Sequence, residues 1–174
     1  MSDRFESERL AMRPQVLDDA EALFEAYGDA ELMTYWSSAP HKDVAETRAY
    51  LATRDPMKPW RGWSITLKGN DRPIGTLAAG ERRNGVIEIG YMLVRRLWGQ
   101  GLAREAVTRL LDVLFLEENR RRVMADTDPD NAASNALLKS LGFTVEGRLR
   151  AEWETHIGVR DSLIWGLLRD EWRV

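Results

Sequence analysis

Apolar residues near the N-terminus recur at helical spacing, and two D-x-x-E patterns precede them. Such a pattern is typical of a helix start, where the two side chains cap free N–H groups. Gly28 then ends the first apolar stretch. These features predict a strand at Arg9–Arg13, helices from Asp18 to Gly28 and from Asp43 to Leu51, and an ordered aromatic loop at Leu32–Pro40 between them.

Period-two alternation replaces helical spacing in the middle of the chain. Turn residues separate the alternating runs, and Asn84-Gly85 is a strong hairpin signal because both residues tolerate a positive φ. The spacing predicts a meander of three antiparallel strands. We expect them at Trp63–Lys68, Ile74–Glu81 and Val86–Val94.

Helical spacing returns at Gly101–Glu118, the longest amphipathic run. A strand at Arg122–Thr127 follows, and the intervening helix indicates a right-handed crossover with parallel pairing to the strand before it. Asn131 can cap a last helix, which Gly142 ends. The remaining elements are expected as a helix at 132–141 and strands at 143–149 and 162–168.

The overall pattern predicts an α+β fold in one domain spanning residues 1–174. We expect a mixed, mostly antiparallel sheet of about seven strands flanked by about four helices. A chain of 174 residues, 44% of them apolar, is long enough to bury its own core. No apolar run approaches the roughly 20 residues of a membrane span, and the start does not resemble a signal peptide, so we expect a cytoplasmic protein.

Composition excludes several kinds of chemistry. The chain has no cysteine, which excludes disulfides, cysteine-zinc sites and thiol nucleophiles. Two histidines are too few for a multi-histidine metal site, and we expect no metal. A net charge of -3 argues against a nucleic-acid-binding protein, which would carry a basic excess.

One turn has the composition of an anion site. A predicted strand leads into Arg95-Arg96 and then Gly99 and Gly101, and a long helix follows. Free N–H groups and the helix dipole favour a pyrophosphate at such a turn, and glycines leave room for it. The glycines could equally serve only to form a tight turn. The spacing matches neither a P-loop nor a dinucleotide-binding G-x-G-x-x-G turn.

Several motifs together carry a resemblance. Arg96-x-x-Gly99-x-Gly101 resembles the acetyl-CoA signature of the GNAT N-acetyltransferase superfamily, and 131–135 with 141–143 resembles its second motif. The segments 8–13, 89–93, 158–161 and 168–172 are similar to the RimJ/RimL branch, which acetylates ribosomal-protein N-termini. The resemblance covers essentially the whole chain, although the branch also contains enzymes that act on small amines.

The resemblance implies where acetyl-CoA binds. The family splays two central strands, here 86–94 and 122–127, and the pantetheine arm lies in the gap. Main-chain groups of one strand would pair with pantetheine, the glycine turn would hold the pyrophosphate, and the next helix would face the cofactor's other side. The residues implied for acetyl-CoA are Met92, Leu93, Val94, Arg96, Trp98, Gly99, Gln100, Gly101, Leu102, Ala103, Asn131, Ser134 and Asn135.

Two carboxylates are candidates for the base that removes the amine proton. Glu152 lies where this branch often places a base, whereas Glu88 shares a strand face with Gly90 and would have a raised pKa if buried. A water chain is the third possibility. Glu152 could instead be an ordinary solvated residue, and Glu88 could pair with Arg82.

The acid that protonates the leaving thiolate is open. Many family members have a tyrosine seven residues after the motif asparagine, and this chain has Leu138 there. Ser134 is the nearby hydroxyl, with Tyr91 as a weaker alternative, although Ser134 could instead bond the backbone at Asn131. Without cysteine, an acetyl-cysteine intermediate is impossible, so we expect direct transfer in a ternary complex.

Aromatic residues are expected to shape the acceptor pocket, although core packing is an equal alternative for any one of them. These residues are Tyr35, Trp36, Trp60, Trp63 and Trp153. The acceptor would be a protein N-terminus or a small amine. A catalytically silent acyl-CoA-binding or sensor protein on the same fold is the alternative function. A homodimer is common among similar proteins, but the sequence has no interface pattern.

Overall fold

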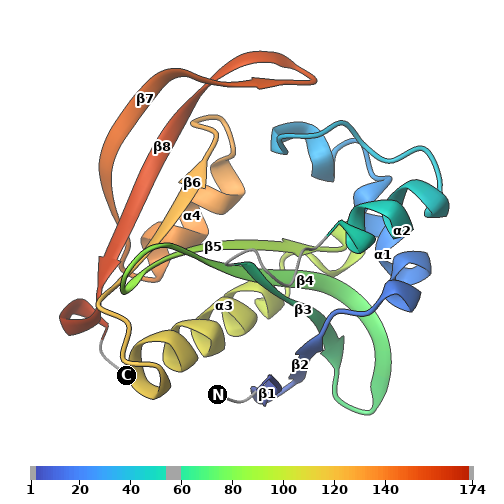
Figure 1. Ribbon diagram of the computed structural model, residues 1–174, viewed down its shortest axis with the longest axis horizontal. Coiled ribbons are helices and arrows are strands. Elements are labelled where there is room, and N and C mark those ends of the chain that lie inside the picture. The colour runs from blue at the N-terminus through green and yellow to red at the C-terminus, as the bar shows by residue number, and fades with distance from the viewer. Residues whose placement is uncertain (1–2, 54–59, 173–174) are drawn as a thin grey trace.

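The computed structural model describes residues 3–53 and 60–172, which form one eight-stranded sheet with helices on both sides (Figure 1). The strands are β1 (Phe5–Glu6), β2 (Leu10–Pro14), β3 (Trp60–Leu67), β4 (Asn70–Arg83), β5 (Val86–Leu93), β6 (Arg122–Thr127), β7 (Thr144–Thr155) and β8 (Gly158–Leu168). The helices are α1 (Ala20–Tyr27), α2 (Val44–Ala52), α3 (Leu102–Asp112) and α4 (Ala132–Ser140). Short helical turns are η1 (Leu17–Asp19), η2 (Leu32–Tyr35), η3 (Arg95–Leu97), the π-helical η4 (Val113–Glu117) and η5 (Arg169–Glu171).

The strand order is β1-β2-β3-β4-β5-β6-β8-β7. Only β5 and β6 are parallel, and every other neighbouring pair in this order is antiparallel. The predicted α+β fold, the meander β3–β5 and the parallel crossover through α3 are therefore confirmed. The sheet has one strand more than expected, because the two-residue β1 is too short to produce a periodic pattern.

The parallel pairing of β5 with β6 is short. It joins Val86–Glu88 to Arg122–Met124 and goes no further. Beyond this point β5 remains paired with β4 and β6 with β8, while their facing edges separate. The splayed central strands that the resemblance implied are thus present in the structure.

Two of the predicted helix starts have the expected caps. The Asp43 side chain accepts a hydrogen bond from the Glu46 N–H at 2.8 Å, and the Asn131 side chain accepts one from the Ser134 N–H at 3.2 Å. The capping role predicted for Asp18 is wrong. Its side chain is exposed, η1 occupies the expected first turn, and α1 begins only at Ala20.

Asp19, the neighbour of Asp18, turns inward and forms a buried ion pair with Arg13. The guanidinium donates to both carboxylate oxygens at 2.8 and 2.9 Å, and the Ser64 hydroxyl donates to the same carboxylate at 2.7 Å. Burial alone would raise the pKa of Asp19, but the hydrogen bonds from Arg13, from the Val16 N–H and from Ser64 outweigh it and lower that pKa. The pair ties the start of α1 to β2 and β3.

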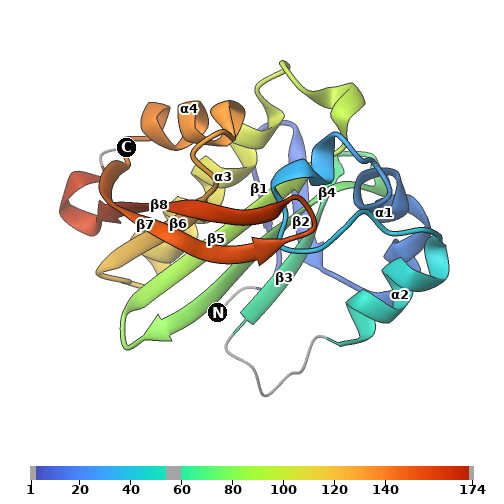
Figure 2. The same cartoon turned by 90° about the horizontal axis from the view of Figure 1, so that it is seen from above.

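The helices cover the sheet in two groups. In Figure 2, α3 and α4 lie on one side of the central strands, and α1 and α2 lie together on the other. The apolar stripe predicted for the Gly101–Glu118 helix is mostly buried, with Ala106, Val107, Leu110 and Leu114 each 0% exposed and Ala103 partly buried. The last two strands form a hairpin that runs past the predicted segments to a turn at His156 and Ile157, and β7 is mostly exposed.

Removing Asp19 should strongly destabilise the fold. We expect Asp19→Ala to lower the free energy of unfolding by about 3 kcal/mol, because the buried Arg13 charge would lose its buried partner and keep only the exposed Asp71 carboxylate. Denaturant unfolding measures this change. The lowered pKa of Asp19 also means that the pair stabilises the fold above the unfolded-state pKa, and that this contribution disappears as pH falls through the folded-state value.

Asp18→Ala is the matched control, because among the described residues the Asp18 side chain contacts only Arg48, in an exposed ion pair. Its effect should stay below about 1 kcal/mol. Equal effects of the two substitutions would contradict the structural role of the buried pair.

Candidate functional site

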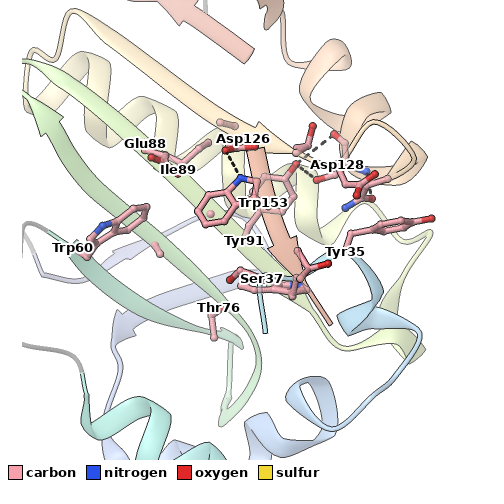
Figure 3. Close-up of a pocket in the computed structure, with 18 of the residues that line it drawn as sticks. Tyr35, Ser37, Trp60, Thr76, Glu88, Ile89, Tyr91, Asp126, Asp128 and Trp153 are labelled. Atoms are coloured by element: carbon pink, nitrogen blue, oxygen red, sulfur yellow. Dashed lines mark hydrogen bonds between the residues drawn. The ribbon is translucent and has the colours of Figure 1, made fainter. Parts of the chain in front are cut away.

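A cavity of about 500 Å³ opens where β5 and β6 separate (Figure 3). Successive residues of a strand point to opposite faces of a sheet. Both Glu88 and Ile89 of β5 line the cavity, as do both Ala125 and Asp126 of β6. The cavity is therefore lined from both faces of the sheet at the gap.

Small residues form the floor on one face. The registers place Trp60 beside Gly80 and Gly80 beside Glu88, and in the next row they place Ala78 beside Gly90. A Cβ on Gly80 would lie 2.4 Å from the Trp60 ring, so only glycine allows this tryptophan to lie across the floor. A Cβ on Gly90 would meet nothing within 4 Å, which shows that the space above this residue is open.

Aromatic side chains surround this floor. Four of the five aromatic residues predicted for the acceptor pocket line the cavity, and Tyr27 and Tyr50 join them. The fifth, Trp63, is 3% exposed and packs against Phe5 at a ring distance of 5.4 Å, outside the cavity. The four are Tyr35, Trp36, Trp60 and Trp153.

Two carboxylates, Glu88 and Asp126, face the cavity from opposite sides of the gap. Burial raises the pKa of Glu88, and the negative charge of Asp126 adds to the increase, while Arg82 opposes it from an ion pair at 2.8 Å. This is the arginine contact that the alternative interpretation of Glu88, as an ion-paired residue, predicts. Asp126 accepts hydrogen bonds from the Trp153 indole at 3.1 Å and from the Ser162 hydroxyl.

The formal charge of the lining is negative. Four carboxylates, those of Glu88, Asp126, Asp128 and Asp161, face two guanidinium groups. Those two groups already have partners. Arg61 pairs with Glu118, and Arg160 binds both Asp128 and Asp130.

The second predicted base, Glu152, does not line the cavity. It lies exposed on β7, whereas its neighbour Trp153 faces the cavity. The structure therefore brings Glu88, not Glu152, together with the other candidate residues.

Two hydroxyl groups meet on the other face of the sheet from the carboxylates. The Tyr91 and Ser134 oxygens are 2.7 Å apart, and both residues line the cavity. Burial raises the pKa of Tyr91 to about 12, so its hydroxyl stays protonated. Ser134 thus bonds Tyr91 through its side chain, while its own N–H binds the Asn131 cap.

Asn135 and Leu138, both on α4, have structural positions. The Asn135 amide donates to the carbonyls of Asp128 and Pro129 and its oxygen accepts from Thr127, so it holds the loop before α4. Asn135 does not line the cavity, although the resemblance implied a cofactor contact for it. Leu138 is 0% exposed in the core.

The glycine turn before α3 has the backbone of an anion site. Gly99 and Gly101 both have φ of 75°, in the left-handed region that favours glycine. Within residues 3–53 and 60–172, no group accepts a hydrogen bond from the main-chain N–H of Gly99, Gln100 or Gly101. Consecutive free N–H groups next to a helix N-terminus suit a phosphate.

The side chains near this turn already have partners within the protein and are therefore less available to an anion than the main-chain N–H groups. The Arg96 guanidinium pairs with Glu25 at 2.6 Å, and the Trp98 indole donates to the Leu93 carbonyl at 2.8 Å. Of the strand residues implied for pantetheine, Val94 already donates its N–H to Ile74. Met92 and Leu93 are buried in β5 beside the gap.

Asp126 is the site residue that sequence reasoning missed. A lone aspartate in an apolar strand has no motif, and only the folded sheet brings it into one cavity with Glu88 and Gly90, two residues past Met124, the last residue of β6 that pairs with β5. Within the part of the chain that the structure describes, no helix is long and apolar enough to cross a membrane, and no three histidine, aspartate or glutamate residues gather as a metal site would need.

Comparison with known proteins agrees with this geometry. The model of the acetyltransferase (GNAT) domain matches residues 9–144. A Bacillus licheniformis protein named uncharacterized N-acetyltransferase p20 is 34% identical over 171 residues, which cover 95% of this chain and 96% of that protein.

Solved structures share the fold. A probable GNAT-family acetyltransferase from Chromobacterium violaceum has a TM-score of 0.90 at 28% identity, covering 99% of this chain and 89% of that one. The ribosomal-protein-S5-alanine acetyltransferase of Vibrio fischeri has a TM-score of 0.79 at 21% identity, covering 99% and 100%. With the motifs, the splayed strands and the family match together, the chain belongs to the GNAT N-acetyltransferase family, in its RimJ/RimL-like branch.

Proposed function

We propose that the protein transfers an acetyl group from acetyl-CoA directly to the primary amine of a small, positively charged acceptor. One observation carries the proposal. The cavity at the gap joins a carboxylate-rich aromatic floor on one face to the Ser134 and Tyr91 hydroxyls on the other. An amine and a thioester that approach from the two faces would meet between the strands.

The residues at the gap and the glycine turn fit acetyl-CoA. The free N–H groups of Gly99, Gln100 and Gly101 would hold the pyrophosphate, and the N–H groups of Leu102 and Ala103 at the start of α3 would add to them. The edge of β5 that faces the gap has no β6 partner beyond Glu88, and its main-chain groups near Met92 and Leu93 would bind the amides of pantetheine, with the Leu93 carbonyl exchanging its bond from the Trp98 indole. When bound, acetyl-CoA supplies an acetyl group activated as a thioester.

The charge of the cavity supports a cationic acceptor. The two arginines in the lining are held by carboxylates. Glu88 keeps an ion pair with Arg82, which lies outside the lining. Asp126 is bound only by the neutral Trp153 and Ser162 donors, so it is the lining carboxylate that has no cationic partner among the described residues. Aromatic faces at Tyr35, Trp36 and Trp60 also attract an ammonium group. An amine that carries its own carboxylate near the nitrogen would be repelled.

Glu88 is the base in this proposal. It removes a proton from the amine, whose nitrogen attacks the acetyl carbonyl carbon, so that the C–N bond forms and the C–S bond breaks. The Ser134 hydroxyl, hydrogen-bonded to Tyr91, gives its proton to the leaving thiolate in place of the tyrosine that Leu138 replaces. The proton that Glu88 took from the nitrogen then returns through solvent to Ser134, so that both groups are restored and the products are the amide and the CoA thiol. The chain has no cysteine that could carry the acetyl group, which supports direct transfer.

A panel of amines tests the acceptor. We expect kcat/KM for 1,4-diaminobutane and tyramine to exceed that for glutamate by at least about tenfold, because the carboxylates attract cations and repel anions. An octapeptide with a free alanine N-terminus tests the peptide alternative. Release of CoA thiol measures each rate. Acetyl-CoA binding without turnover on every amine would instead support a silent acyl-CoA-binding protein.

Gly90→Val tests where the acceptor binds. The added side chain would enter open space in the cavity, so the acceptor KM should rise while the fold stays intact. Gly147→Val is the matched control, since a Cβ there also meets nothing within 4 Å and Gly147 lies outside the cavity. The same KM for both variants would place the acceptor elsewhere.

Gly101→Trp tests the pyrophosphate turn. The indole should block the free N–H groups and strain the left-handed backbone, so we expect the acetyl-CoA KM to rise at least about tenfold. Gly69→Trp makes the same change at φ of 84° in the exposed turn between β3 and β4, and it should leave KM unchanged. An unchanged KM in Gly101→Trp would refute the assignment.

Glu88→Gln and Glu152→Gln separate the two candidate bases. We expect Glu88→Gln to lower kcat by about 100-fold, with Glu152→Gln close to wild type. Because the base must be deprotonated and the pKa of Glu88 is raised, wild-type activity should fall as pH drops through that raised value. The pH–rate profile measures this acidic limb. If Glu152→Gln removes it instead, Glu152 is the base.

A further inference from the structure

The arm of β7 that reaches the cavity contains an irregularity. Leu149 pairs with Ser162 and Trp153 pairs with Arg160, so the three residues at 150–152 lie opposite Asp161 alone. The middle residue, Ala151, has φ of 51°, in the left-handed region where alanine is disfavoured. Bulges of this kind bend a strand and redirect its side chains, often beside active sites.

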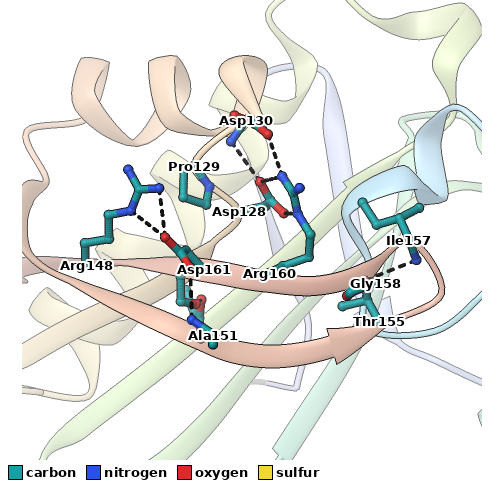
Figure 4. A network of polar contacts seen from close by, with 12 residues as sticks. Asp128, Pro129, Asp130, Arg148, Ala151, Thr155, Ile157, Gly158, Arg160 and Asp161 are labelled. Atoms are coloured by element: carbon teal, nitrogen blue, oxygen red, sulfur yellow. Dashed lines mark hydrogen bonds and ion pairs between the residues drawn. The ribbon is translucent and has the colours of Figure 1, made fainter.

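Asp161 holds the bulge in place (Figure 4). One carboxylate oxygen accepts the Ala151 N–H at 2.9 Å, and the other accepts the Arg148 guanidinium at 2.8 Å. The hydrogen bond from Ala151, followed by the one from Arg148, lowers the pKa of Asp161. The carboxylate thus binds an N–H group that the bulge takes out of the strand ladder.

The strand opposite the bulge is fixed independently. Arg160 on β8 donates to Asp128 at 2.7 and 2.9 Å and to Asp130 at 2.5 Å, which ties β8 to the loop before α4 (Figure 4). The contacts of Asp161 therefore determine how β7 leaves this anchored strand.

Trp153 is the first paired residue after the bulge. Its side chain crosses β8, its indole donates to Asp126 on β6 at 3.1 Å, and it lines the cavity (Figure 3). Trp153 is 45% exposed, so much of its ring surface is free for a ligand. Glu152, one residue earlier and still inside the bulge, lies outside the cavity.

We propose that Trp153 is a specificity-determining wall of the acceptor site and that Asp161 is a positioning residue that acts through it. The bulge held by Asp161 places the indole over the floor near Glu88 and Gly90, where the body of the acceptor stacks on it. The role of Trp153 rests on the proposed function, since it requires the acceptor to bind on this floor. The placement of Trp153 by Asp161 does not.

The indole N–H signal of Trp153 tests the placement without any turnover. In a ¹H–¹⁵N spectrum, Trp153→Phe identifies this signal as the one it removes. We expect Asp161→Ala to shift the signal and speed its exchange with solvent, because the hydrogen bond to Asp126 would be lost. Glu154→Ala, an exposed substitution on the same strand, should leave it unchanged. An unchanged Trp153 signal in Asp161→Ala overturns the positioning role.

Substitutions at Ala151 test the bulge without touching Asp161. Glycine adopts a positive φ freely, whereas a β-branched residue there is strongly disfavoured. Ala151→Gly should therefore keep the Trp153 signal in place, and Ala151→Val should displace it as Asp161→Ala does. Displacement by neither variant would show that the bulge does not place the indole.

Kinetics with the best amine of the panel test the specificity role. We expect Trp153→Ala to raise the acceptor KM by about tenfold and to leave the acetyl-CoA KM within about twofold, because only the acceptor wall is lost. Trp153→Phe should recover most of this loss. Asp161→Ala alone should raise the acceptor KM. When it is combined with Trp153→Ala, the acceptor KM should be the same as that of Trp153→Ala alone.

The outcomes separate the two proposals. Independent, multiplying effects of Asp161→Ala and Trp153→Ala would overturn the claim that Asp161 acts through Trp153. Equal increases in both KM values would mean a general structural defect and would also overturn it. Failure of every amine would reject the proposed function and the wall, while the indole signal would still decide the placement.

Discussion

The pairing of β5 with β6 stops after Glu88 and Met124, and the site is organised around this interruption. Each strand keeps its outer neighbour, so the two facing edges cannot close without disrupting the rest of the sheet. Main-chain N–H and C=O groups inside a protein need partners. A sheet that leaves such groups unpaired at its centre is prepared for an extended ligand with amides of its own.

Strand alternation gives the two faces of the gap different chemistry. On β5, Glu88 and Gly90 point to the aromatic floor, while Tyr91 points to the hydroxyl of Ser134. A short stretch of one strand therefore supplies a carboxylate, an open space and a protonated hydroxyl. Because these groups are on one rigid element, their relative placement does not depend on a loop.

Local signals predicted much of this arrangement, and long-range contacts explain the remainder. The turn at Gly99 and Gly101 depends on neighbouring residues, so its sequence was sufficient to predict it. The spacing of Asp18 predicts a helix cap, but the next residue, Asp19, pairs with Arg13 on β2, and α1 begins only after it, at Ala20.

Neither the bulge nor the role of Asp126 could be predicted from the sequence, and the reasons are related. Alanine does not mark a left-handed residue as glycine would, so nothing distinguished Ala151. Asp126 gains its place only from strand register. Glu152 and Trp153 are adjacent in the chain, yet Glu152 is exposed to solvent while Trp153 lines the cavity.

The pairing of β5 with β6, which consists of three residue pairs, also has a mechanical consequence. It is the only strand pairing that holds β6, β8 and β7 to the rest of the described sheet, so a ligand that bridges the gap would act as an additional strand, and its binding free energy would also count as cohesion between the two halves of the sheet.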